Sequence, residues 1–217
     1  MIGSRGRLIT LEGIEGAGKT TQRDTVCHVL LEAGLPMLKT REPGGSEIAE
    51  RIRILLLDPD NQEMSSVTEL LLMFAARAEH LVKTVQPALA EGTWVVCDRF
   101  TDTSYAYQGA GRGLALEHIK ALKNLVQGKL TPNLTLLLDL PAETGLARAK
   151  QRGLTDRFES ETLDFFRRAR QQYLALAAEE PERIRVIDAA ASLEQVTATV
   201  TSIVQGYIAA ERGRIVP

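Results

Sequence analysis

Apolar residues along the chain gather in five short continuous runs, and polar segments separate one run from the next. A continuous apolar run bounded by turn residues is typical of a strand that is buried on both faces of a parallel sheet. The runs cover residues 8–11, 36–39, 94–97, 134–140 and 184–187. They predict the strands of a sheet that is covered by helices on both faces.

Between the runs, apolar residues recur at the three- and four-residue spacing of an amphipathic helix. In the first such segment Val26, Val29, Leu30 and Ala33 keep this spacing, and Gly34 ends the helix. We expect further helices over residues 48–56, 119–126, 146–152, 163–177 and 193–208. The last of them opens with a capping box, Ser192-x-x-Gln195.

A longer helix is predicted over residues 66–82, beginning with the capping box Ser66-x-x-Glu69. Its expected buried stripe consists of Val67, Leu70, Leu71, Phe74, Ala78, Leu81 and Val82. The repeated strand–helix–strand order implies a parallel sheet, and no linker, repeat or low-complexity segment divides the sequence. We therefore predict one α/β domain over residues 1–217.

Composition narrows the class of protein further. The sequence is 44% hydrophobic and 25% charged with a net charge of -2, which suits a soluble globular domain and gives no general attraction to polynucleotides or anionic lipid. No apolar stretch is long enough for a signal peptide or a membrane span. Cys27 and Cys97 lie in no zinc-binding pattern, so we expect buried thiols in a reducing cytoplasm. His28, His80 and His118 lie on predicted helices without partners at ligand spacing, which favours surface or packing roles.

The clearest motif follows the first predicted strand. Residues 13–20 read GIEGAGKT and match G-x-x-x-x-G-K-[ST], between a strand and a helix as the motif requires. In such a P-loop the backbone N–H groups surround phosphate oxygens and the helix adds its positive N-terminal end. Lys19 is then expected to reach the β- and γ-phosphates of a nucleotide, and the Thr20 hydroxyl to bind Mg²⁺. The expected ATP-binding residues here are Gly13, Gly16, Ala17, Gly18, Lys19, Thr20 and Thr21.

A P-loop indicates a nucleotide but not a reaction, and three classes share it. A GTPase switch is disfavoured because the sequence has neither D-x-x-G nor N-K-x-D. A motor or remodelling ATPase needs more chain than these 217 residues provide. A small-molecule kinase is the leading class.

The carboxyl ends of two other predicted strands carry candidate chemistry. Asp98 and Arg99 follow the third run, where such folds hold Mg²⁺ with a carboxylate and bridge phosphate groups with an arginine. A strand-end salt bridge is the alternative for this pair. The stretch 40–45, TREPGG, ends the second strand at the edge where ligands of open α/β sheets bind.

Together these residues resemble the thymidylate kinases over nearly the whole chain. The resemblance is carried by LEGIEGAGKTT, TREPGGSEIAERIR, ELLLMFAAR, CDRFTDTSYAYQGAGRG, PNLTLLLDLP and RAKQRGLTDRFE. It implies a P-loop NTPase fold of the nucleoside monophosphate kinase type with a five-stranded parallel sheet, transfer of a phosphoryl group from ATP to dTMP, Mg²⁺ and a homodimer. The alternative is another nucleoside monophosphate or deoxynucleoside kinase on the same sheet.

The resemblance also implies roles for single residues. Lys19, Arg99, Arg152 and Glu15 would be catalytic, and Thr20 with Asp98 would bind the metal. Glu15 would contact the sugar 3'-hydroxyl, Tyr107 would exclude a ribose 2'-hydroxyl, and Arg53 with Arg99 would hold the dTMP phosphate. The implied dTMP site consists of Glu15, Glu42, Pro43, Arg53, Leu57, Met73, Phe74, Arg77, Arg99, Ser104, Tyr107 and Gln108, with Arg77, Ser104 and Gln108 at the thymine base.

Two departures from the family pattern matter. The position four residues before Arg77, often an aromatic that stacks on thymine, is Met73 here, and Phe74 follows it. We favour Met73 on the base with Phe74 nearby, although Phe74 could swing in. Gly16 follows Glu15 where some relatives carry an arginine, so the transition-state cation must come from elsewhere.

The segment 148–159 resembles the lid of the bacterial subtype that supplies this cation. Its candidates are Arg148, Lys150, Arg152 and Arg157, of which Arg152 is the first choice. Arg148 could instead stack on adenine, beside the loop 188–191. A solvated helix face is the alternative for the cluster, because Arg148 and Arg152 are i, i+4 neighbours.

Overall fold

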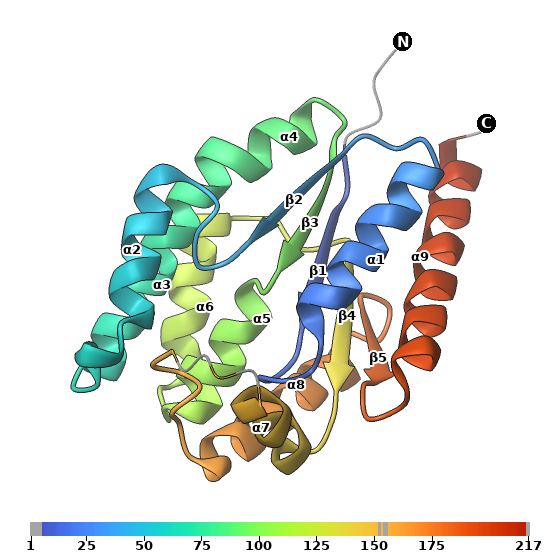
Figure 1. Ribbon diagram of the computed structural model, residues 1–217. Coiled ribbons are helices and arrows are strands. Elements are labelled where there is room, and N and C mark those ends of the chain that lie inside the picture. The colour runs from blue at the N-terminus through green and yellow to red at the C-terminus, as the bar shows by residue number, and fades with distance from the viewer. Residues whose placement is uncertain (1–5, 152, 154–155, 216–217) are drawn as a thin grey trace.

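A five-stranded parallel sheet with the order β2-β3-β1-β4-β5 forms the centre of the computed structural model, which describes residues 6–151, 153 and 156–215 (Figure 1). The strands are β1 (Leu8–Glu12), β2 (Met37–Arg41), β3 (Trp94–Asp98), β4 (Leu134–Asp139) and β5 (Ile184–Asp188). All five predicted strands are confirmed. Residues of β1, β3 and β4 are almost completely buried, as the continuous apolar runs require.

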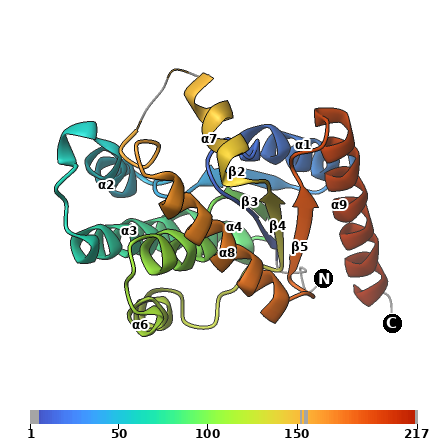
Figure 2. The same cartoon turned by 90° about the horizontal axis from the view of Figure 1, so that it is seen from below.

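Helices cover both faces of the sheet (Figure 2). The described elements are α1 (Lys19–Glu32), α2 (Glu47–Leu57), α3 (Ser66–His80), α4 (Gln86–Ala90), α5 (Thr101–Ser104), α6 (Leu116–Gln127), α7 (Ala142–Gln151), α8 (Leu163–Glu179) and α9 (Leu193–Ile215). A 3₁₀ turn covers Pro59–Asn61, and π-helical turns cover Leu81–Val85 and Tyr105–Gly111. Helices α1 and α9 lie on one face, and α4 and α8 lie on the other. This is the α/β architecture that the sequence predicts.

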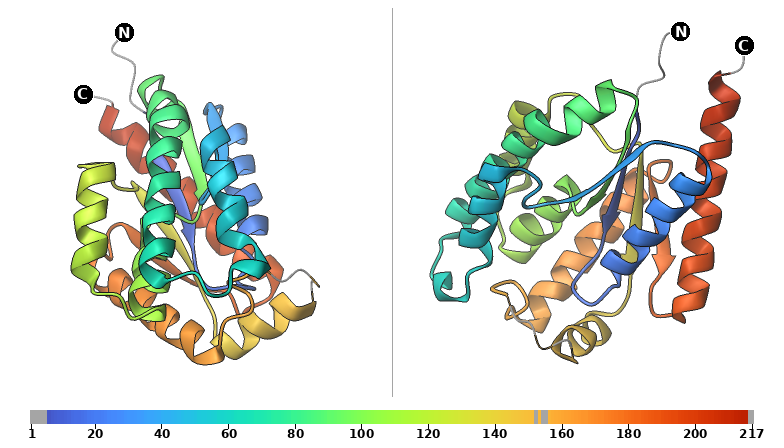
Figure 3. Two further views of the ribbon diagram at one scale, coloured as in Figure 1. Left: turned by 90° about the vertical axis from the view of Figure 1, so that its left-hand side faces the viewer. Right: turned by 45° about the horizontal axis from the view of Figure 1, so that its top comes forward.

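Helix α3 differs from its prediction in two ways. The side chain of Ser65, not Ser66, accepts the capping hydrogen bond, from the Thr68 N–H at 3.2 Å. Of the predicted stripe, Leu70, Phe74 and Leu81 are buried, whereas Val67, Leu71 and Val82 are exposed. The buried face also carries Glu69, Arg77 and His80, which apolar spacing does not detect. Helix α3 packs beside α2 on the outside of the molecule (Figure 3).

The register of the sheet brings three loops to one edge. Leu11 of β1 and Arg41 of β2 both pair with Asp98 of β3, so these strands end at the same level. Strand β4 pairs with the other side of β1. Strand β1 therefore lies between β3 on one side and β4 on the other, and the loops after these strands lead away in opposite directions. Ligands of open α/β sheets bind at such a point.

Candidate active site

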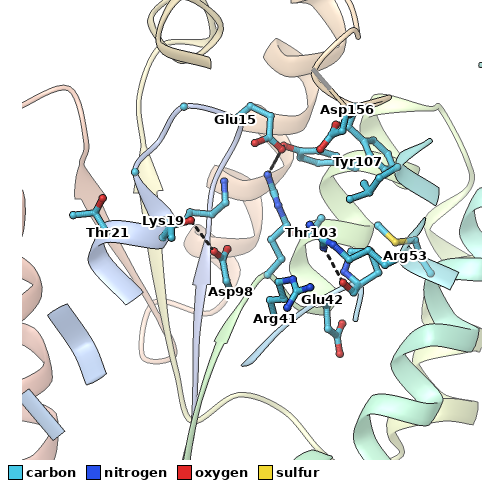
Figure 4. Close-up of a pocket in the computed structure, with 18 residues that line it drawn as sticks. Glu15, Lys19, Thr21, Arg41, Glu42, Arg53, Asp98, Thr103, Tyr107 and Asp156 are labelled. Atoms are coloured by element: carbon cyan, nitrogen blue, oxygen red, sulfur yellow. Dashed lines mark hydrogen bonds and ion pairs between the residues drawn. The ribbon is translucent and has the colours of Figure 1, made fainter. Parts of the chain in front are cut away.

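One cavity opens at this edge of the sheet. In Figure 4, Lys19, Thr21 and Asp98 lie on one side of the cavity, and Arg53, Tyr107 and Asp156 lie on the other. Its lining combines P-loop residues with residues from β2, α2, α3, β3, the turn around Tyr107 and the segment after α7. The lining residues are Glu15, Gly16, Gly18, Lys19, Thr20, Thr21, Arg41, Glu42, Pro43, Arg53, Leu57, Met73, Asp98, Arg99, Thr103, Tyr107, Asp156 and Phe158.

The P-loop has the geometry of a phosphate site. Gly16 and Gly18 have φ of 74° and 85°, conformations that favour glycine and turn the backbone into a tight loop. No side chain caps the N-terminus of α1 at Gly18, so its first N–H groups are left for an anion. The Lys19 ammonium donates to the carbonyls of Gly13 at 3.0 Å and Ile14 at 2.8 Å. Burial and the nearby Arg99 lower the pKa of Lys19 to about 8.

Two oxygen ligands suited to Mg²⁺ meet beside Lys19. The Thr20 hydroxyl donates to the Asp98 carboxylate at 3.5 Å, and the Arg23 guanidinium lies 3.9 Å from the same carboxylate. Within the described ranges, no group of three or more His, Cys, Asp or Glu side chains is placed to hold a metal on its own. Mg²⁺ in nucleotide sites takes one or two protein ligands and completes its shell with phosphates and water. The hydroxyl and the carboxylate fit that mode of binding.

Arg99 occupies the middle of the cavity in a constrained backbone conformation. Its φ is 65°, which lies in the left-handed region that non-glycine residues rarely adopt. Among the described residues, Arg99 is the non-glycine residue with a positive φ. The guanidinium pairs with the Glu15 carboxylate and donates to the Tyr107 hydroxyl at 3.0 Å and the Gly13 carbonyl at 3.0 Å. Glu15, Arg99 and Tyr107, which the sequence predicts around the sugar and phosphate, are thus in mutual contact.

A second charged cluster lies at the wall formed by Glu42. The Glu42 carboxylate accepts from Arg77 Nε at 2.6 Å and pairs with His80 Nδ1 at 3.0 Å. His80 Nε2 bonds the Thr40 hydroxyl at 2.8 Å. Burial raises the pKa of Glu42, but the interactions with Arg77 and His80 outweigh burial and lower the pKa below its usual value. His80 is fully buried and fixes the 40–45 loop, which is the packing role that the sequence favours.

Gln108 lies in a third cluster, around the buried Glu69. Gln108 Nε2 donates to Glu69 at 2.8 Å, and Glu69 also forms ion pairs with Arg112 at 3.0 Å and Arg157 at 2.6 Å. Arg157 Nε donates to the carbonyl of Leu56 at 2.9 Å. Arg157 is therefore a buried anchor at the end of the 148–159 segment and not a free cation.

Two polar atoms behind the cavity wall lack partners. Arg77 Nη1 and Gln108 Oε1 are buried, and neither has a hydrogen-bond partner within the described structure. One is a donor and the other an acceptor, and burying such groups unpaired is costly. Gln22 Oε1 and Ser46 Oγ are buried without a partner in the same way.

Comparison with known proteins decides the family. A model of the thymidylate kinase family matches residues 11–200. The thymidylate kinase of Ectopseudomonas mendocina (strain ymp) is 54% identical over 96% of this chain and 99% of its own length. That of Pseudomonas putida (strain W619) is 54% identical over 94% and 99%. The chain belongs to the thymidylate kinase family. A crystal structure of the thymidylate kinase from Ehrlichia chaffeensis agrees, with a TM-score of 0.75 at 32% identity, covering 93% of this chain and 99% of that one.

Most site residues that the family pattern predicts line the cavity. Of the predicted site residues that the structure describes, those that do not line it are Gly13, Ala17, Phe74, Arg77, Ser104, Gln108 and Arg148. Arg77 Nη2 donates to Ser104 at 3.1 Å, and the Phe74 ring lies 4.5 Å from the Arg77 guanidinium. These three residues lie together behind Glu42, which pairs with Arg77, whereas Gln108 lies beside Glu69. Met73 itself reaches the cavity, whereas Phe74 does not.

The segment after α7 is placed only in part. Arg148 donates to the carbonyl of Ala189 at 2.8 Å, so it lies beside the 188–191 loop. The sequence predicts this loop to border the adenine ring on which Arg148 could stack. Lys150 is exposed. Arg152, the predicted lid cation, lies outside the described residues.

Four cavity residues were not among the predicted site residues. They are Arg41, Thr103, Asp156 and Phe158. All four lie inside stretches that carry the family resemblance. Their position in these stretches was the sequence feature that could have identified them as site residues. Arg41 pairs with Glu50 at 2.8 Å, and the Asp156 carboxylate accepts from the Phe158 N–H at 2.9 Å.

Proposed function

We propose that this cavity binds ATP at the P-loop and dTMP at the opposite wall, with the two phosphate groups meeting between Lys19 and Arg99. Membership of the family gives the overall reaction, in which the γ-phosphoryl group of ATP passes to dTMP to form dTDP and ADP. The observation that carries the proposal is that one cavity is lined both by the P-loop and by Arg41, Arg53 and Arg99. Cations on both sides suit a reaction that brings two anionic substrates together.

On the dTMP side, the guanidinium groups provide the phosphate site. Arg53 Nη1 donates to the Pro43 carbonyl at 2.8 Å, and this bond holds the guanidinium at the cavity wall. Arg99, with its planar fork of donors, would hold the phosphate from the other side. Glu15 and Tyr107 would then adjoin the sugar, where the carboxylate accepts from the 3'-hydroxyl and the ring leaves no room for a 2'-hydroxyl.

At the base end, the unpaired atoms of Arg77 and Gln108 match a thymine. The Arg77 donor would meet the acceptor O4, and the Gln108 acceptor would meet the N3–H donor. Cytosine presents the opposite pattern, an acceptor at N3 and a donor at N4. Met73 would cover the ring, as the sequence favours. Arg77 and Gln108 do not line the cavity, so the side chains in front of them must move for the base to reach them.

Catalysis then consists of positioning and charge stabilisation. The dTMP phosphate is already an anionic nucleophile, so no general base is required. Lys19 and Arg99 would hold the transferred group between ATP and dTMP and stabilise its equatorial oxygens. The Thr20 hydroxyl and Asp98 carboxylate would hold Mg²⁺. When bound, the metal neutralises charge on the ATP phosphates.

Base and sugar selectivity tests the proposal. We expect dTMP to be phosphorylated at least about a hundredfold better than dCMP or UMP, because each mismatched buried group costs about 1–3 kcal/mol. The measurement is coupled ADP release with dTMP, dUMP, dCMP, dGMP, UMP and thymidine side by side. Comparable rates with UMP would contradict the sugar assignment, and a preference for another monophosphate would point to a different kinase of this fold.

We further propose that residues 1–217 form a single kinase domain, with the lid at about 148–159, and that it works in the cytoplasm as a homodimer. The two cysteines of the described chain are free and buried, as a reducing compartment allows. In the part of the chain that the structure describes, no helix has the length and apolar character to cross a membrane. Apolar side chains are exposed along α2 and α3, and this surface suits a second copy of the chain. They are Ile48, Ile54, Leu55, Val67 and Leu71.

Dimerisation can be tested on α3. Leu71 has 52% of its surface exposed, so Leu71→Asp should leave the monomer fold intact and disrupt a dimer that buries this side chain. Sedimentation equilibrium should show the wild type as a dimer and the variant as a monomer. Leu125→Asp on α6, where the side chain is 80% exposed, serves as the control. A wild-type monomer, or a dimer that Leu71→Asp leaves unchanged, would rule this face out.

A further inference from the structure

Glu12 is a fully buried carboxylate at the end of β1, directly before the P-loop. Neither the P-loop motif nor the proposed contacts to dTMP use it. Burying a carboxylate is unfavourable unless hydrogen bonds satisfy it. Three donor groups lie within hydrogen-bonding distance of Glu12: the Phe100 N–H at 2.7 Å, the Thr103 hydroxyl at 2.6 Å and the Tyr173 hydroxyl at 3.2 Å. These donors come from three segments around Arg99.

The first of these bonds fixes the backbone of Arg99. Arg99 has a φ of 65°, and a non-glycine residue held in that region costs of order 1 kcal/mol or more. The Arg99 N–H bonds the Leu11 carbonyl at 2.9 Å, and the next N–H, that of Phe100, bonds the Glu12 carboxylate. Consecutive residues of β1 thus clamp both sides of the strained residue. This turn is what directs Arg99 back over the P-loop, where it bonds the Gly13 carbonyl.

The other two bonds orient the groups that hold the Arg99 side chain. Arg99 Nη1 donates to the Thr103 hydroxyl at 3.3 Å and to the Tyr173 hydroxyl at 3.4 Å. Each hydroxyl has one hydrogen, and an ionised Glu12 can only accept. The two hydroxyls also lie 2.7 Å from each other, so one hydrogen bridges them. When Thr103 donates to Glu12 Oε2 and accepts from Tyr173, both oxygens keep a lone pair for the guanidinium. The carboxylate therefore sets the direction of both hydroxyls, that of Thr103 directly and that of Tyr173 through Thr103.

We propose that Glu12 is the positioning residue of Arg99: it clamps the strained backbone turn and orients the two hydroxyl groups that receive the guanidinium. The inference rests on the proposed function, in which Arg99 binds the dTMP phosphate. Glu12 touches neither substrate and acts through Arg99. Its loss should therefore affect the use of dTMP more than the use of ATP.

The charges around Glu12 provide a second readout. Burial, and then the neighbouring Asp102, raise the pKa of Glu12 to about 7, while Arg99 opposes the shift. Because only the ionised carboxylate sets the hydroxyls in this way, kcat/KM for dTMP in the wild type should rise as the pH increases through about 7. The charged and titratable groups around Glu12 are Lys19 of α1, Cys97 of β3, Arg99, Asp102 of α5 and Tyr173 of α8.

Glu12→Gln is the principal test, because it keeps the shape of the side chain and removes its charge. The amide oxygen can still accept from the Phe100 N–H, but the amide nitrogen donates to the two hydroxyls and turns their hydrogens toward Arg99. We expect kcat/KM for dTMP to fall at least about tenfold, with KM for MgATP within about threefold of wild type. Asp102→Asn is the matched control: this buried neighbour pairs with Arg183 at 2.7 Å rather than with Arg99, and its kcat/KM should stay within about threefold.

Stability separates positioning from a purely structural role. The raised pKa means that ionised Glu12 destabilises the fold: the penalty is absent below pH 4.5, grows as the pH rises to about 7 and is complete above it. Glu12→Gln should therefore unfold at pH 8 at a temperature no lower than wild type while losing activity. The rise of kcat/KM for dTMP with pH through about 7 should be smaller in Glu12→Gln than in the wild type.

Two outcomes would overturn the inference. One is a Glu12→Gln enzyme with kcat/KM for dTMP within about twofold of wild type; the other is an equal loss for dTMP and ATP together with a lower melting temperature. If Glu12→Gln does not fold, Tyr173→Phe removes one bridging hydroxyl and should lower kcat/KM for dTMP in the same selective way, and an unchanged value would count against the proposal. A wild type that does not phosphorylate dTMP would instead refute the proposed function.

Discussion

Lys19→Met is expected to lower kcat/KM by at least about 10³-fold, the range seen when a principal cation is removed from phosphoryl transfer. Methionine keeps the unbranched stem but cannot donate to the β- and γ-phosphates. In the structure the ammonium is held on the Gly13 and Ile14 carbonyls, within the P-loop. When a nucleotide binds, the ammonium can exchange these carbonyls for phosphate oxygens with little rearrangement of the loop. Activity retained in Lys19→Met would remove the P-loop from the mechanism.

The control for this variant is another lysine of similar length. Lys39 is half-exposed and pairs with Asp24 on the outside of the sheet, so Lys39→Met should keep wild-type activity. Lys19→Met should also remain folded. It loses two hydrogen bonds, but it removes a buried charge whose desolvation lowers the pKa, and these two effects on the free energy of unfolding oppose each other.

The pKa of about 8 for Lys19 gives this prediction a pH signature. Below pH 8 the ammonium is charged and ready for ATP; above it the free enzyme loses the charge. We expect kcat/KM for ATP to fall by up to about tenfold per pH unit above pH 8, because this ratio reports the free enzyme. The kcat value should fall only at higher pH, since bound phosphates restore the proton affinity of the amine. A kcat/KM that is flat to pH 9.5 would contradict the assignment.

The sheet and the P-loop were predictable because their signals are local. A buried strand is a continuous apolar run, and residues 13–20 contain the whole phosphate-binding loop. The short helix α5 and the π-helical turn after it, which carry Ser104, Tyr107 and Gln108, have no such periodicity. Their residues were found by resemblance to a family and not by pattern.

The contacts among the residues behind the cavity could not be predicted from the sequence for a different reason. Glu69 meets Gln108 and Arg157 only because α3, the turn after α5 and the segment after α7 pack together. Sequence alone lists Arg157 with Arg148 and Lys150 as a candidate lid cation after Arg152. The structure separates them: it buries Arg157, places Arg148 on the 188–191 loop and leaves Lys150 exposed. Glu12 lies in the quoted stretch LEGIEGAGKTT but precedes the pattern G-x-x-x-x-G-K-[ST], which gives it no role.

Arg152→Ala is expected to lower kcat at least about a hundredfold while dTMP affinity stays within a few fold. An arginine that closes over the transferred phosphoryl group acts in the transition state, so its removal should affect turnover rather than binding. Single-turnover kinetics and dTMP titration measure the two effects separately. Lys120→Ala, an exposed cation on α6, is the control and should match wild type. Equal losses in binding and turnover would contradict the lid role.

A P-loop arginine should not rescue this variant, although some relatives carry one at the position of Gly16. A Cβ at Gly16 would lie 2.0 Å from the Gly145 carbonyl of α7, and φ there is +74°. The opposing Gly145 is equally close, since its own Cβ would lie 2.5 Å from the Glu15 carbonyl. Gly16→Arg must therefore push α7 from the P-loop, and a displacement of about 1 Å in a catalytic site can cost about a hundredfold in rate. The double variant Gly16→Arg, Arg152→Ala should be no more active than Arg152→Ala, and recovery to within about tenfold of wild type would show that the contact can yield.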